Sequence, residues 1–192
     1  MKPLLLLLAL LLPLQAALPS PTDAAKERLE TAINEVMAVA SRSSGDRELA
    51  EDLRPVLLKY ISFDVLTRRA VGPGWSKFTE AQKQEVVRMF TTLTIRTYSS
   101  KITPGERPVI EIKNATNPAP GRVEINTSVL YQGKRTAVVY RMEEAEGWRI
   151  TDIVIEGVSM ILNYRTQFDA QFKKGGANAV LRALTQTLNK PQ

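Results

Sequence analysis

The residues that most often carry out catalysis or bind metal are missing from this chain. Its 192 residues include no histidine and no cysteine. Without histidine there is no serine–histidine triad, and the commonest general base and metal ligand is absent. Without cysteine there are no thiolate ligands and no cysteine nucleophiles. The composition therefore argues against most hydrolase and zinc chemistry.

Serine and carboxylate patterns are the remaining catalytic candidates, and neither completes a site. Ser159 stands in a Gly-x-Ser sequence like a nucleophile elbow, but Ile161 occupies the position that requires glycine. Glu143 and Glu144 are adjacent at the end of a predicted strand, beside a turn, where we expect solvent to surround them. Only a carboxylate pair assembled from distant segments stays open as acid–base chemistry.

Phosphate loops and nucleic-acid motifs are also missing. No Gly-x-x-x-x-Gly-Lys sequence occurs, and Gly72-x-Gly74 lacks a third glycine and a preceding strand. The net charge of +6 comes from 26 basic and 20 acidic residues. The basic residues form scattered pairs without interleaved aromatic residues. We therefore expect a protein that is not an enzyme, with no catalytic residue, metal, cofactor or nucleic-acid partner.

The first 17 residues have the pattern of a secretory signal peptide. Lys2 precedes an unbroken apolar stretch at 4–12, which a proline and two alanines follow. This stretch is shorter than the roughly 20 residues that span a bilayer, so a cleaved signal is favoured over a membrane anchor. We predict a signal peptide at 1–17 and a single exported domain at 18–192.

Apolar periodicity divides that domain into helices, then strands, then helices. Leu29, Ile33 and Val36 recur at helical spacing, and Thr79-x-x-Gln82 is a capping box. Helices are expected at 22–41, from 46 with an interruption at Pro55, and at 62–70, 80–101, 158–174 and 177–188. Alternating strands are expected at 109–113, 122–130, 135–142 and 148–155, with turns at Gln132-Gly133 and Glu146-Gly147.

This order of elements predicts an α+β fold with an antiparallel or mixed curved sheet of about four strands. The helices before and after the sheet are expected on one face of it. Gly157 turns the last strand into the 158–174 helix, which we expect to pack under the sheet. The break at 71–74 is either a hinge or a plain loop.

Two apolar faces are broader than a single helical stripe. Thr94 and Tyr98 add hydroxyl groups to the apolar face of the 80–101 helix. Val158, Met160 and Ile161 point in several directions at the start of the next helix. Such faces suit either an ordinary core or the wall of an apolar cavity.

The sheet-to-helix segment carries a family resemblance. Its sequence, GWRITDIVIEGVSMILNYRTQF, is followed by a Gly-Gly pair and a closing amphipathic helix. It resembles the MlaC family of periplasmic phospholipid-binding proteins, also called toluene-tolerance auxiliary proteins. Further matches follow in the same order over nearly the whole mature chain: Tyr60-x-x-Phe63-Asp64, Arg68-Arg69, Trp75, 79–84 and Arg96-Thr97-Tyr98. A hopanoid-associated group shares the pattern.

The resemblance implies a lipid carrier whose cargo is phospholipid or, as the alternative, a hopanoid-type lipid. Family members enclose acyl chains in an apolar cavity between sheet and helices. They carry lipid through the periplasm between an outer-membrane lipoprotein complex and the MCE-domain subunit of an inner-membrane ABC transporter. On this chain we expect lipid contacts at Leu66, Val71, Phe90, Thr94, Tyr98, Ile102, Val154, Val158 and Ile161.

Partner docking is expected at Arg149 and Arg165, which lie in the sheet-to-helix region of a chain with a positive net charge. Two other functions stay open. One is an exported enzyme that uses carboxylates in a small α+β pocket. The other is an exported interaction module that carries no lipid. Bound lipid would separate the carrier from both.

Overall fold

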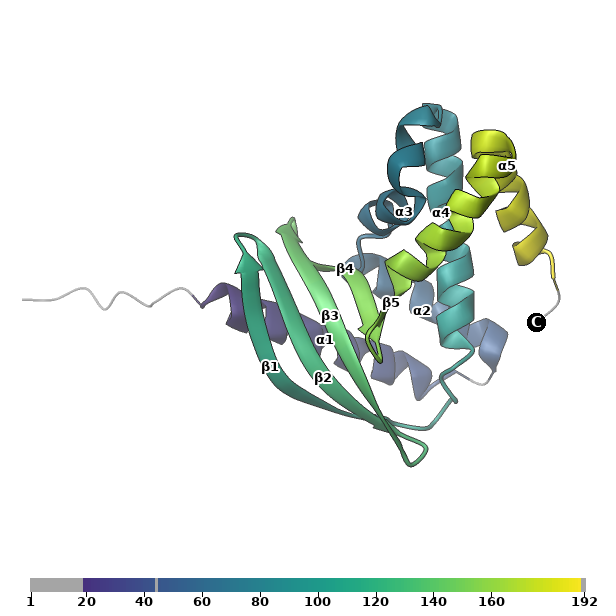
Figure 1. The fold of residues 1–192 in the computed structure, drawn as a ribbon. Coiled ribbons are helices and arrows are strands. Elements are labelled where there is room, and N and C mark those ends of the chain that lie inside the picture. Colours follow the sequence, from purple (N-terminus) through teal and green to yellow (C-terminus); the bar gives the residue numbers. More distant parts are fainter. Residues whose placement is uncertain (1–18, 44, 191–192) are drawn as a thin grey trace, which may run out of the picture.

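The computed structural model describes residues 19–43 and 45–190. The predicted signal peptide at 1–17 lies outside them. The elements, shown in Figure 1, are α1 (Pro21–Ala40), α2 (Asp46–Tyr60), α3 (Phe63–Val71), the 3-10 helix η1 (Gly72–Lys77), α4 (Glu80–Ser99), β1 (Val109–Ala119), β2 (Arg122–Tyr131), β3 (Lys134–Ala145), β4 (Gly147–Ile155), β5 (Val158–Ser159) and α5 (Met160–Leu188). This order confirms the α+β fold. No described helix combines the length and apolarity needed to cross a membrane.

The sheet is an antiparallel meander in the order β1-β2-β3-β4-β5. Gln132 and Gly133 both have positive φ, at 48° and 73°, which gives the tight β2–β3 turn that the sequence predicts. Five strands form rather than about four because the chain reverses directly after Ile155. Glu156 and Gly157 have φ of 49° and 78°, and Val158 then pairs with Ile155.

A capping box and a glycine pair lie where the sequence predicts the start of α4 and a break within the last helical segment. Thr79 Oγ1 accepts the N–H of Gln82 at 3.2 Å, and Gln82 Oε1 accepts the N–H of Thr79 at 2.9 Å, which completes the capping box of α4. Gly175 and Gly176 take non-helical dihedral angles and divide α5. Each of these signals fixes the residue at which a helix begins or ends, and so the part of the helix that packs in the core.

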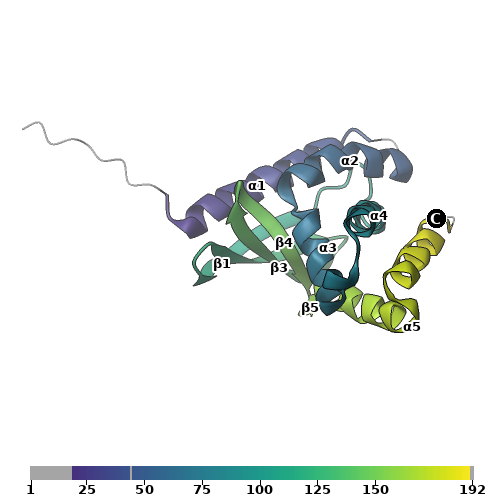
Figure 2. The same ribbon diagram turned by 90° about the horizontal axis from the view of Figure 1, so that it is seen from above.

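The helices cover the sheet differently from our expectation. α1 runs along the sheet and contacts β1, β2 and β4, as Figures 1 and 2 show. α5 packs mainly on α3 and α4, and only its start meets β4 and β5. The reversal at β5 carries α5 away from the sheet. The inner face of the sheet therefore faces α1, and a space remains between them.

A packed aromatic core joins α4 to α5. The ring of Phe90 meets those of Tyr164 and Phe168 edge-on, at centroid distances of 4.7 and 5.1 Å. Beside it, the ring of Phe172 lies over Phe78 at 6.0 Å and close to Gly74. The break that the sequence places at 71–74 is therefore a short helix packed against α5.

Candidate functional site

An apolar cavity of about 320 Å³ lies between the sheet and α1, α2, α3 and α4. Its wall includes Leu29, Ile33 and Val36, the stripe of α1 that shows helical spacing. The opposite wall is built by β1 to β4, with most of its residues on β3 and β4. None of the described residues that line the cavity carries a charge. Such a cavity can hold hydrocarbon.

A bulge in β4 keeps the sheet side of this cavity apolar. Arg141 of β3 pairs with Asp152, but the next residue, Met142, pairs with Ile150. One extra residue on β4 shifts its alternation, so Ile150, Ile153 and Ile155 all line the cavity. Strict alternation from Ile150 would have turned Asp152 inward.

Asp152 instead lies buried on the other side of β4 and fixes the start of α5. Its Oδ2 accepts a hydrogen bond from Ser159 Oγ at 2.7 Å, and its Oδ1 accepts the N–H of Ile161 at 3.2 Å. Arg141 Nη1 approaches Oδ2 to 3.2 Å. Ser159 Oγ in turn accepts the N–H of Leu162 as the N-cap of α5. This cluster joins β4 to α5 and lies outside the lining of the apolar cavity.

Four of the nine residues proposed for lipid contact line the cavity: Leu66, Thr94, Tyr98 and Ile102. The other five lie elsewhere. Phe90 belongs to the α4–α5 aromatic core, and Val71 and Ile161 are buried in the main core. Val154 lies outside the lining because of the bulge in β4. Val158 is 61% exposed at the β4–β5 reversal.

Sequence reasoning overlooked two parts of the wall. The stripe of α1 was visible as a helix face, but nothing in its spacing shows that it covers the sheet. Val138 and Tyr140 lie two residues apart on β3, so alternation places both on one face, and both line the cavity. That alternation was the available signal for Tyr140.

Among the described residues, five polar side chains line the cavity, and three of them are hydrogen-bonded within the protein. Tyr60 donates its hydroxyl hydrogen to Glu35 Oε1 at 2.6 Å. Thr94 and Ser99 donate to the carbonyls of Phe90 and Arg96 on their own helix. For Tyr98 and Tyr140 no partner is found within the described parts of the chain.

Burial raises the pKa of both unpartnered tyrosines. Burial raises the pKa of Tyr140 to about 12. Burial also raises the pKa of Tyr98, with smaller contributions from nearby Tyr164 and Asp152. Both hydroxyls therefore stay protonated at neutral pH and remain hydrogen-bond donors inside an apolar space.

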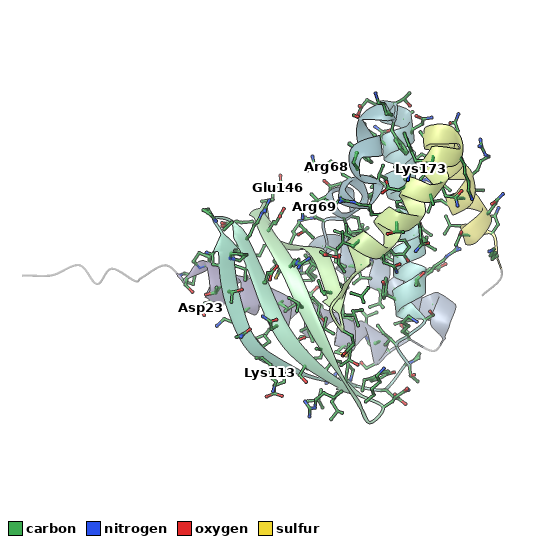
Figure 3. All side chains as sticks on the ribbon, in the orientation of Figure 1. Asp23, Arg68, Arg69, Lys113, Glu146 and Lys173 are labelled. Carbon is green, nitrogen blue, oxygen red and sulfur yellow. The ribbon has the colours of Figure 1, made fainter. Side chains whose placement is uncertain are left out.

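A larger groove of about 680 Å³ lies between α2, α3 and α4, away from the cavity. Arg68 and Lys83 line it together with Asp64 and Glu80. Figure 3 shows Arg68 beside Arg69 on α3. The groove is open and carries both signs of charge, so it suits water or a protein surface better than acyl chains. We therefore place the functional site in the smaller cavity.

The two arginines proposed for docking make contacts within the protein. Arg165 Nε and Nη2 donate to the carbonyl of Arg69 at 3.0 and 2.5 Å, which ties α5 to the end of α3. Arg149 Nη1 donates to the carbonyl of Leu58 at 3.3 Å. Arg165 therefore donates two hydrogen bonds within the protein, whereas Arg149 donates one.

Comparison with known proteins finds a family model and solved structures that match the chain. Residues 28–186 match the family model described as MlaC protein. The fold is similar to a solved structure of the phospholipid-binding protein from Ralstonia solanacearum in complex with a phospholipid. The TM-score is 0.78 at 25% sequence identity, and the alignment covers 84% of this chain and 95% of that one. No curated protein matches the chain.

Proposed function

Because this chain belongs to the MlaC family of phospholipid-binding proteins, which are not enzymes, we propose that it is a periplasmic lipid carrier. It holds phospholipid acyl chains in the cavity between α1 and the sheet. It moves the lipid between an outer-membrane lipoprotein complex and the MCE-domain subunit of an inner-membrane ABC transporter. The predicted signal peptide at 1–17 would deliver it to the periplasm.

The uncharged cavity is the observation that carries this proposal. Acyl chains need a space without charges, because an unpaired charge in an apolar site costs several kcal/mol. The wall is assembled from α1 through α5, from Leu29 to Met160, which supports reading 18–192 as one lipid-binding domain. The phospholipid in the similar Ralstonia solanacearum protein favours phospholipid over a hopanoid-type cargo.

The two acyl chains of a phospholipid, on the order of 30 methylene groups, are the proposed cargo of this cavity.

The energetics of hydrocarbon explain why such a carrier needs docking partners. Burying about 30 methylene groups at about 0.8 kcal/mol each amounts to roughly 20 kcal/mol or more, close to the limit of non-covalent affinity. Release into water is therefore prohibitive. A membrane or a partner cavity offers the chains a similar environment, so direct transfer can be almost neutral. Arg149 is the better placed of the two candidate docking arginines, because Arg165 is engaged with Arg69.

Lipid extraction tests the binding half of the proposal. The protein is purified from the periplasm without detergent, and its lipids are extracted and quantified by mass spectrometry. We expect about one phospholipid per protein. A hopanoid-type lipid would identify the alternative cargo. Protein that is empty, and that takes up no lipid from vesicles, would contradict the proposal.

Lipid transfer tests the carrier half. Protein loaded with a fluorescent phospholipid is mixed with buffer, with plain vesicles, or with vesicles that contain the ABC transporter and its MCE-domain subunit. We expect slow loss to buffer and the fastest transfer to vesicles with the transporter. Rapid loss to buffer would contradict the transfer mechanism even if binding is stoichiometric.

A further inference from the structure

Three of the described tyrosines line the cavity, and their hydroxyl groups differ in their partners. Tyr60 donates to Glu35 Oε1 at 2.6 Å. Tyr98 and Tyr140 have no hydrogen-bond partner in the described parts of the chain, so each faces the space for the cargo with an unpaired donor. Outside the cavity, Tyr131 accepts the N–H of Thr103 at 2.8 Å.

Such hydroxyls are costly in an apolar space unless something accepts their hydrogen. Buried polar groups in proteins are almost always hydrogen-bonded, and leaving one unpaired costs about 1–3 kcal/mol. Tyr140 lines the cavity without an acceptor among the described residues, and burial raises its pKa to about 12, so its hydroxyl keeps its proton at neutral pH. Its missing acceptor points to the ligand.

The cavity wall decides which part of a phospholipid can be that acceptor. No charged side chain lines the cavity in the described structure, so the phosphate has no cation to pair with inside it. The ester carbonyl oxygens, where each acyl chain joins the glycerol, are neutral acceptors. They are also the polar atoms nearest to the hydrocarbon, so they enter the cavity first when the chains do.

We propose that the hydroxyls of Tyr98 and Tyr140 donate hydrogen bonds to the ester carbonyl oxygens of the bound phospholipid. Tyr98 comes from α4 and Tyr140 from β3, so the glycerol end is held from a helix and a strand at once. These two contacts set the depth to which the acyl chains enter. The inference rests on the proposed function, since it assumes that phospholipid occupies this cavity.

Ester and ether phospholipids separate this inference from lipid binding in general. The protein is incubated with vesicles that contain equal amounts of diester phosphatidylcholine and its diether analogue with the same chain lengths. The bound lipids are then extracted and their ratio is measured. We expect the wild type to enrich the diester about fivefold for each hydrogen bond that forms.

Phenylalanine variants assign the preference to the two hydroxyls. Tyr98→Phe and Tyr140→Phe should each lower the diester enrichment, and the double variant should bring the ratio close to one. Tyr131→Phe is the matched control, because its hydroxyl has a partner outside the cavity, and it should keep the wild-type ratio.

Several outcomes would overturn the inference. Equal binding of diester and diether by the wild type would do so while leaving the proposed function intact. An undiminished preference in the double variant would do so as well. Failure of the wild type to bind either lipid would remove the proposed function itself.

Discussion

Ile102 and Val158 are a pair of aliphatic residues that test the cavity one side chain at a time. Ile102 lines the cavity in the connection between α4 and β1, whereas Val158 lies outside the lining and is 61% exposed. A carboxylate in an apolar site costs several kcal/mol unless it is paired, but the same group in water costs little. We therefore expect Ile102→Asp to lower the phospholipid content of folded protein at least tenfold, while Val158→Asp keeps it.

The measurement is lipid per protein after purification without detergent, in samples whose circular dichroism matches the wild type. Val158→Asp serves as the control for an added negative charge. Lipid retained in Ile102→Asp, or lost equally in both variants, would show that the cavity is not the lipid site.

Asp152 is the buried carboxylate with the clearest structural role. It accepts from Ser159 and from the N–H of Ile161, and it approaches Arg141. Removing one partner of a buried, hydrogen-bonded charge leaves the others unpaired. We expect Asp152→Ala to lower the free energy of unfolding by about 3 kcal/mol in urea titrations.

Glu124 provides the contrast for that measurement. It also contacts Arg141, at 2.9 Å, but it is 36% exposed, whereas the side chain of Asp152 is 6% exposed. Glu124→Ala should therefore cost less than about 1 kcal/mol. Equal losses in the two variants would mean that Asp152 does not hold β4 to α5.

At the scale of elements, Arg165 joins α5 to the end of α3. Its two donors satisfy the carbonyl of Arg69, and its guanidinium lies against Gly72, where an added Cβ would come within 3.1 Å of Nε. Arg165→Met keeps much of the side-chain length but removes both hydrogen bonds. We expect the free energy of unfolding to fall by about 1–3 kcal/mol.

The same variant distinguishes a structural from a docking role. If Arg165 acts within the fold, folded Arg165→Met protein should transfer lipid to transporter-containing vesicles at the wild-type rate, at low and at high salt. A slower transfer that appears only at low salt, with stability unchanged, would restore Arg165 to a docking surface.

Most elements could be predicted from local signals in the sequence. The capping box at Thr79 and Gln82, the Gln132-Gly133 turn and the Gly175-Gly176 break each act over a few residues, and each appears where the sequence places it. Signals of this kind depend only on the residue types at a few neighbouring positions, so the sequence alone predicts them.

The composition of the cavity wall could not be predicted in the same way. A single extra residue on β4 turns Ile153 into the cavity and Val154 away from it. No residue type in that strand predicts the bulge. Contacts between residues far apart in the sequence determine that α1, and not α5, covers the sheet. Helical spacing shows which face of a helix is apolar but not what that face meets.

At the scale of the whole molecule, the uncharged cavity predicts weak selection between lipid head groups. The head group must stay at the mouth of the cavity or outside it, because no charged residue lines the described wall. We expect less than a tenfold preference between zwitterionic and anionic phospholipids with matched chains, about 1.4 kcal/mol. Competition between the two lipids for delipidated protein measures it, and a much larger preference would reveal a polar site beyond this cavity.

The central claim is that acyl chains lie between α1 and the sheet rather than in the open groove on the far side of α3. Neighbouring residues separate the two sites, because Leu66 lines the cavity and Val65 lines the groove. The most direct measurement uses a phospholipid with a diazirine at the end of an acyl chain. The lipid is loaded and photolysed, and the labelled residues are mapped by peptide mass spectrometry. We predict labels on Phe63, Leu66 or Ile150; labels on Val65, Trp75 or Val87 instead would contradict the account.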